Sequence, residues 1–219
     1  MAFQAGGQRS APRPTPTTPE AQAYLQDYAA LLEAVPFPSF VVDHRWDVVL
    51  ANGAFRTLFQ GAGPHPTAMP DDNFLRFVLF HPDASTVLGE HESSWCLPML
   101  AHFAATLERY GHDPGLQAVR RDIAQDPIME AAYRQGLPHW VRAVGARAVE
   151  HDGAVRPLHH PDPRRGTTEC RVVMEASGTL QELECTRVTL VLREPRRTVQ
   201  RSPRAGRTTA HLRVVPTAE

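Results

Sequence analysis

Two short apolar runs followed by an amphipathic segment stand out within residues 36–59. The runs cover residues 39–43 and 46–51, and the polar pair His44-Arg45 separates them. Both runs are rich in valine, which favours buried strands. Asn52 is a good helix cap, and the apolar residues after it share one helical face: Ala54, Phe55, Leu58 and Phe59. The pattern predicts a strand, a tight turn, a second strand and a helix.

A separate helix is expected ahead of these strands, over residues 18–34. Thr18 can cap it, Pro19 suits its first position, and Pro36 cannot continue it. Its apolar positions recur at helical spacing and form one stripe: Tyr24, Tyr28, Leu31 and Leu32.

The middle of the chain is predicted to be mostly helical. Residues 73–80 are dense in aromatic and branched side chains and fit either a short buried helix or a strand. Residues 91–111 have helical periodicity, with Pro98 in the first turns or at a kink. Another helix should begin at Asp113-Pro114, and a further one should run from Asp126 or Pro127 to Arg134.

Strand patterns return near the end, over residues 155–160, 169–175 and 183–192. Strands thus open the domain, helices fill its middle and strands close it. This order predicts an α+β fold with a PAS-like antiparallel sheet and helices packed on one face.

The composition fits one domain with two tails. The chain has 219 residues and a formal net charge of -1, which gives no global field for nucleic acid or membrane. Residues 1–17 are expected to be a disordered leader and residues 196–219 a disordered, Arg-rich tail. No signal peptide or membrane span is evident, so we expect a cytoplasmic protein. Its three cysteines form no CxxC pair and should be reduced.

No motif for catalysis or for a cofactor is apparent. The chain lacks GxSxG and a phosphate-binding glycine loop. His151, His159, His160 and Asp162 lie close together in sequence, but adjacent histidines on a strand point to opposite faces. We therefore predict no catalytic residues, no metal site and no cofactor.

Two segments resemble a known family, the MmyB-like transcription regulators. They are VPFPSFVVDHRWDVVLANGAFRTLF at residues 35–59 and DNFLRFVLFHPDA at residues 72–84. The similarity concerns the ligand-binding domain of that family, which has a PAS-like fold, and extends over residues 35–195. The positions that match the family pattern are Arg45, Trp46, Asp47, Val48, Asn52, Leu58, Phe59, Asn73, Leu75, Arg76 and Pro82.

The resemblance implies a sensor with a cavity for a small hydrophobic ligand, such as a fatty acid. Apolar walls with a few polar groups would form such a cavity. Arg76 is our first candidate for pairing with a ligand carboxylate and Arg45 the second. The predicted ligand-binding residues are Phe40, Trp46, Phe55, Phe59, Phe74, Arg76, Phe77, Val78, Trp95 and Phe103.

The chain departs from the family pattern at its start. Members usually carry an N-terminal helix-turn-helix domain, whereas residues 1–34 are too short for one and show no such pattern. We therefore expect DNA contact only indirectly or through a partner. The helix at residues 18–34 is the expected output or dimer element of a possible homodimer. The alternatives are a PAS-like protein-interaction module without a ligand and a metal-assisted enzyme.

Overall fold

A computed structural model describes residues 18–160 and 166–193. The predicted leader at residues 1–17 and the tail at residues 196–219 lie outside the described residues. In the described part of the chain, no helix is long and apolar enough to cross a membrane.

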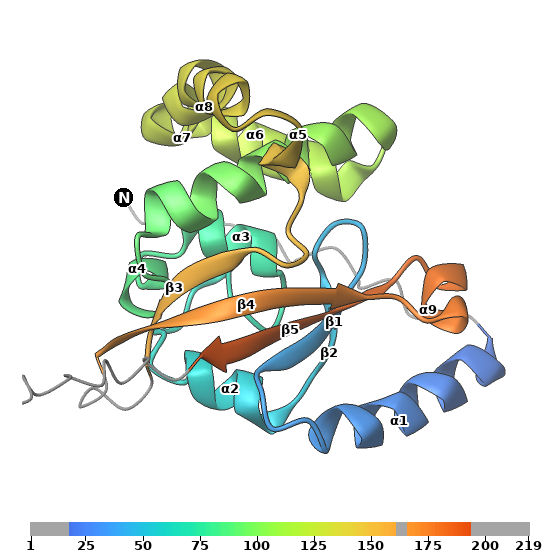
Figure 1. Cartoon of the computed structure of the whole chain (residues 1–219). Helices are drawn as coiled ribbons and strands as arrows, with labels where there is room; N and C mark the ends of the chain where they lie inside the picture. Colours follow the sequence, from blue (N-terminus) through green and yellow to red (C-terminus); the bar gives the residue numbers. More distant parts are fainter. Residues whose placement is uncertain (1–17, 161–165, 194–219) are drawn as a thin grey trace, which may run out of the picture.

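One five-stranded sheet organises the domain (Figure 1). Its order is β2-β1-β5-β4-β3, and every neighbouring pair is antiparallel. The strands are β1 (Ser39–Val42), β2 (Val48–Ala51), β3 (Val155–His159), β4 (Thr167–Glu175) and β5 (Thr186–Arg193). The first strand pairs with the last, with Ser39 opposite Thr189. The predicted α+β fold with an antiparallel sheet is confirmed.

A helical layer covers one face of the sheet and extends well beyond it (Figure 1). It consists of α2 (Gly53–Phe59), α3 (Phe74–Phe80), α4 (Ala84–Val87), the π-helical segment η1 (His91–Cys96), α5 (Leu97–Arg109), α6 (Pro114–Gln125), α7 (Pro127–Ala131), the π-helical segment η2 (Ala132–Gly136), α8 (Leu137–Val144) and the 3₁₀ helix η3 (Gly145–Val149).

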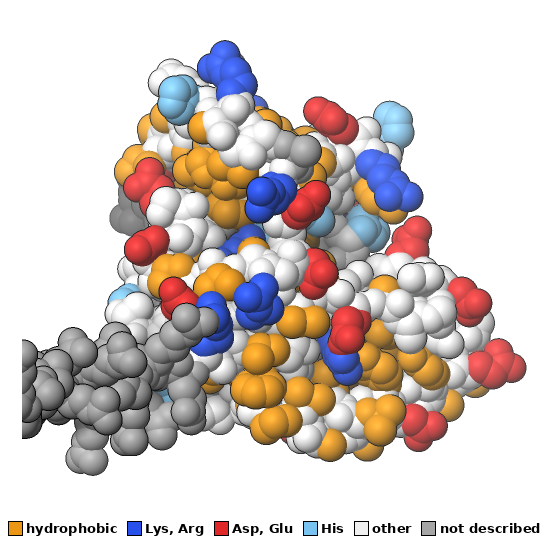
Figure 2. Space-filling view, viewed as in Figure 1, with side chains coloured by type: hydrophobic (Ala, Val, Ile, Leu, Met, Phe, Trp, Pro, Cys, Tyr) orange, Lys and Arg blue, Asp and Glu red, His pale blue; other side chains and the backbone are white. Residues whose placement is uncertain are grey.

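The first helix, α1 (Pro19–Glu33), lies on the opposite face of the sheet. Alternation along β1 creates the two sides: Phe40 and Val42 join the main core, whereas Val41 packs with Leu25 and Leu32 of α1. A small helix, α9 (Gly178–Glu182), connects β4 to β5 and adds Leu180 to this second cluster. Figure 2 shows hydrophobic side chains gathered in the lower part of the view, where Figure 1 draws both α1 and α2.

Several predicted boundaries were wrong for identifiable reasons. The second strand begins at Val48 instead of Trp46, because Trp46 has a left-handed backbone, with φ of 64°, that no strand accommodates. For residues 73–80, where a helix and a strand were both expected possibilities, the structure has the helix, because Asn73 caps it through a hydrogen bond from Arg76 N. The helix predicted to end at Arg134 continues to Val144 across η2, since Pro138 occupies the first turn of α8.

The side chain of Asn52 connects four segments of the chain. Its Oδ1 accepts hydrogen bonds from Ser39 N at 3.0 Å and from Phe55 N at 2.9 Å. Its Nδ2 donates to the carbonyls of Leu32, Val35 and Phe37 at 2.9–3.2 Å. Asn52 is only 1% exposed, so the amide itself depends on these bonds rather than on water.

We expect Asn52→Ala to lower the free energy of unfolding by roughly 2–4 kcal/mol, because buried backbone groups lose their partners. Urea denaturation followed by circular dichroism measures this change. Gln60→Ala, at the exposed end of the neighbouring helix, is the control. A loss no larger than that of the control would show that Asn52 is not a structural node.

Candidate functional site

The loop between β1 and β2 holds Trp46 in a fixed position. Asp43 Oδ1 accepts hydrogen bonds from Arg45 N at 2.8 Å and from Asp47 N at 2.9 Å. Trp46 N donates to Asp43 O at 3.0 Å, and Trp46 O accepts from Phe74 N at 2.9 Å. The indole is therefore directed into the interior, where Trp46 is 4% exposed.

A second set of bonds attaches this loop to α3. Asn73 Nδ2 donates to Asp47 Oδ1 at 2.7 Å and to Arg45 O at 3.0 Å. Burial raises the pKa of Asp47, while the hydrogen bond from Asn73 opposes that shift. The matching family positions in the two sequence segments thus contact one another.

The predicted aromatic residues come together in one core. Centroid distances of 4.6–6.4 Å link the rings of Phe40, Phe55, Phe59, Phe74 and Phe77. The same core contains Trp46, Val78, Trp95 and Phe103. Their contact with a ligand stays a prediction.

The two predicted carboxylate-binding arginines already have acidic partners. Arg76 forms an ion pair with Asp122, and its Nε donates to Thr67 O at 2.8 Å. Arg45 pairs with Asp43 at 3.1 Å and with Asp47 at 2.9 Å. In this arrangement Arg76 ties α3 to α6 and Arg45 stabilises the hairpin loop.

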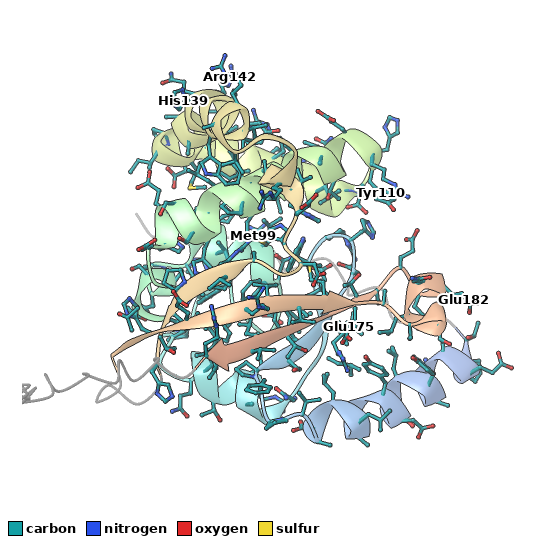
Figure 3. The ribbon with its side chains drawn as sticks, viewed as in Figure 1. Met99, Tyr110, His139, Arg142, Glu175 and Glu182 are labelled. Carbon is teal, nitrogen blue, oxygen red and sulfur yellow. The ribbon has the colours of Figure 1, made fainter. Side chains whose placement is uncertain are left out.

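A cavity of about 410 Å³ lies between α5 and the ends of β1, β4 and β5. Val42, Trp46 and Met174 contribute apolar wall, and His102 and Arg109 contribute polar groups. Tyr110, which also lines it, ends α5 on the side of the molecule where β4 ends at Glu175 (Figure 3). The volume falls in the range of about 300–1,000 Å³ that ligand pockets occupy. Trp46 thus joins the aromatic core to this cavity.

Three basic residues that were not predicted to bind a ligand lie in this region: His102 and His151 beside Trp46, and Arg156 beside His151. The ring of His151 is 5.0 Å from that of His102 and 5.5 Å from that of Trp46. His151 Nδ1 is 2.6 Å from Arg156 Nη2, and the Arg156 guanidinium lies 5.0 Å from the Trp95 ring centroid. The alternation of β3 carried a signal for this burial, because Arg156 shares a face with apolar Leu158.

The histidines and cysteines show no arrangement for other chemistry. His151 packs against His102 rather than against His159, and Asp162 lies outside the described residues. Among residues 18–160 and 166–193, no group of three or more His, Cys, Asp or Glu residues could hold a metal ion. Burial raises the pKa of Cys96 and Cys170 to about 12, so these thiols are poor nucleophiles at neutral pH.

The buried histidines should make stability depend on pH. Burial is the main cause that lowers the pKa of His102, and burial with the nearby Arg156 charge holds the pKa of His151 well below 6.5. Below pH 6.5 the unfolded chain therefore binds more protons than the folded chain, and the free energy of unfolding falls as the pH falls.

When the pH is lowered from about 7.5 to about 5.5, we expect the free energy of unfolding to fall less for His102→Gln than for wild type. Glutamine removes one of the protons taken up on unfolding and keeps a donor for Val149 O. Denaturant titration at both pH values measures the effect, and His139→Gln on the outer side of α8 is the control (Figure 3). Equal losses in wild type and both variants would contradict the expectation.

Comparison with known proteins supports the resemblance of the two segments. The family model described as the MmyB-like transcription regulator ligand binding domain matches residues 25–197, well over half of the chain. None of the curated proteins compared with the chain matches it. The match spans α1 from Leu25, the whole sheet and the whole helical layer. The chain therefore belongs to the MmyB-like transcription regulator ligand-binding domain family.

Proposed function

We propose that this domain senses a small hydrophobic ligand, such as a fatty acid, in cytoplasmic transcription regulation. The observation that carries the proposal is the 410 Å³ cavity lined by Trp46, a residue that also belongs to the aromatic core. The family, a ligand-binding domain of transcription regulators, supports a binding role rather than a catalytic one. A metal-assisted reaction has no support among the described residues, where no metal-binding cluster exists.

The apolar tail of the ligand would lie against Trp46, Val42 and Met174. If the ligand entered more deeply, it would displace the rings around Trp46. We therefore propose a further set of ligand-binding residues: Phe40, Phe55, Phe59, Phe74, Arg76, Phe77, Val78, Trp95 and Phe103. Of the polar groups at this cavity, Arg109 could donate hydrogen bonds to a ligand oxygen, whereas the ring N–H of His102 already bonds Val149 O.

Ligand binding would be transmitted through β1 to α1. Phe40 and Val42 of β1 face the ligand side, whereas Val41 faces Leu25 and Leu32 of α1. A ligand that binds one arrangement of this strand better than another shifts the population towards it. The position of α1 would change in response and alter contact with a second copy or with a partner that binds DNA.

A direct test is native mass spectrometry of the purified protein, followed by denaturing extraction and lipid analysis. We expect a co-purifying acyl compound and binding of added fatty acid that Ala105→Trp weakens at least about tenfold. Ala105 lines the cavity, and Ala143→Trp at an exposed position of α8 is the matched control. No bound compound, together with no thermal shift from a fatty-acid panel, would instead favour a protein-interaction module.

The dimer proposal concerns the outer side of α1. Leu31 is 67% exposed there, whereas Leu25 and Leu32 are buried beneath it. We expect Leu31→Glu to convert a dimer into a monomer without loss of fold, because a charge in an apolar interface is costly. Analytical ultracentrifugation measures the mass. Ile128→Glu, at an 80% exposed position of α7, should leave the dimer intact, and a wild-type monomer would reject the idea.

A further inference from the structure

A second, smaller cavity of about 190 Å³ lies where the helical layer meets β3. Its lining comes from η1, α5, α8, η3 and the start of β3, and shares no residue with the cavity beside Trp46. Pro98, Trp140 and Val144 make most of its apolar wall. Ser94 and Arg156 are polar residues in that lining.

Arg156 is a buried cation in this lining. It is 5% exposed, and its hydrogen-bond partner is the ring nitrogen Nδ1 of His151 at 2.6 Å. Within the described ranges, no carboxylate forms an ion pair with it. Other partly buried arginines differ, since Arg45 pairs with Asp43 and Asp47, and Arg120 pairs with Glu130. An uncompensated charge at such depth is unfavourable.

His151 and Cys170, the immediate neighbours of Arg156, do not supply a negative charge. Arginine has only donors, so His151 Nδ1 must accept, and the proton of the neutral ring is then on Nε2. Burial raises the pKa of Cys170 to about 12, so this residue is a neutral thiol. Glu150 lines the same cavity but forms no ion pair with Arg156 in the described structure.

We propose that this cavity binds the carboxylate of a small organic acid, which pairs with Arg156 while its apolar body lies against Trp140, Pro98 and Val144. A guanidinium binds a carboxylate through paired hydrogen bonds. The volume suits a body of about one six-membered ring, because a cavity of about 150 Å³ accommodates benzene. Arg147 also lines the cavity, so its lining carries two positive charges against the one negative charge of Glu150.

Occupation of this site would join separate parts of the fold. The acid would contact β3 through Arg156, α8 through Trp140 and η3 through Arg147, so it would hold the outer helices against the sheet. A ligand that binds only the folded chain raises its stability according to its concentration and affinity. The site is independent of the proposed sensing of a hydrophobic ligand beside Trp46.

The test compares benzoate with benzamide, its neutral analogue of similar shape, on the full chain by calorimetry and thermal denaturation. We expect benzoate to bind at least about tenfold more tightly and to raise the melting temperature. Equal binding of the two compounds, or no binding of benzoate at millimolar concentration, would overturn the proposal. This comparison needs no variant, and it leaves the fatty-acid proposal untouched.

Arg156→Met separates a ligand-binding arginine from a purely structural one. We expect it to reduce benzoate affinity at least about tenfold to the level of benzamide, without a lower melting temperature in the absence of ligand. Arg142→Met, on the outer side of α8, should behave as wild type (Figure 3). A lower melting temperature with unchanged benzoate affinity would identify Arg156 as structural and reject the site.

Discussion

One buried amide organises the start of this domain. Asn52 accepts from the backbone of β1 and of α2, and it donates to the carbonyls that end α1 and form the connection to β1. The position of α1 on the far face of the sheet therefore depends on the same side chain that begins α2 on the near face. Any motion that moves α1 must change or lengthen the bonds from Asn52 to the carbonyls of Leu32, Val35 and Phe37.

Trp46 is the second constraint, because its strained backbone conformation directs its side chain into the interior. A left-handed backbone at a residue with a side chain costs roughly 1–2 kcal/mol, which the bonds around Asp43 and Phe74 offset. The strained position directs the indole to the meeting point of the aromatic core, the larger cavity and the histidine pair. Pressure on this ring from the cavity would act directly on the backbone of the hairpin loop.

Much of the fold could be predicted from the sequence, because local patterns decide it. Valine-rich runs identified the opening strands, and Asn52 marked the start of α2. The helix at residues 178–182 was missed, since it carries only Leu180 as a buried residue. The site was harder: Arg76 lies among apolar neighbours in sequence, yet its partner Asp122 is distant and only the fold brings them together. Arg156 was overlooked because its burial depends on the helices packed over β3.

The order of the strands has a kinetic consequence. Among the strands of residues 18–160 and 166–193, the central strand β5 comes last in sequence, and it lies between β1 and β4. Ser39 pairs with Thr189 across almost the whole length of the domain. During synthesis the opening hairpin and the helices must wait, with one edge of β1 unpaired, until β5 is released. Contacts between residues so far apart in sequence slow folding. Until β5 pairs with β1, the nascent protein therefore exposes an open strand edge. Its helices must meanwhile shield the apolar face of the opening hairpin.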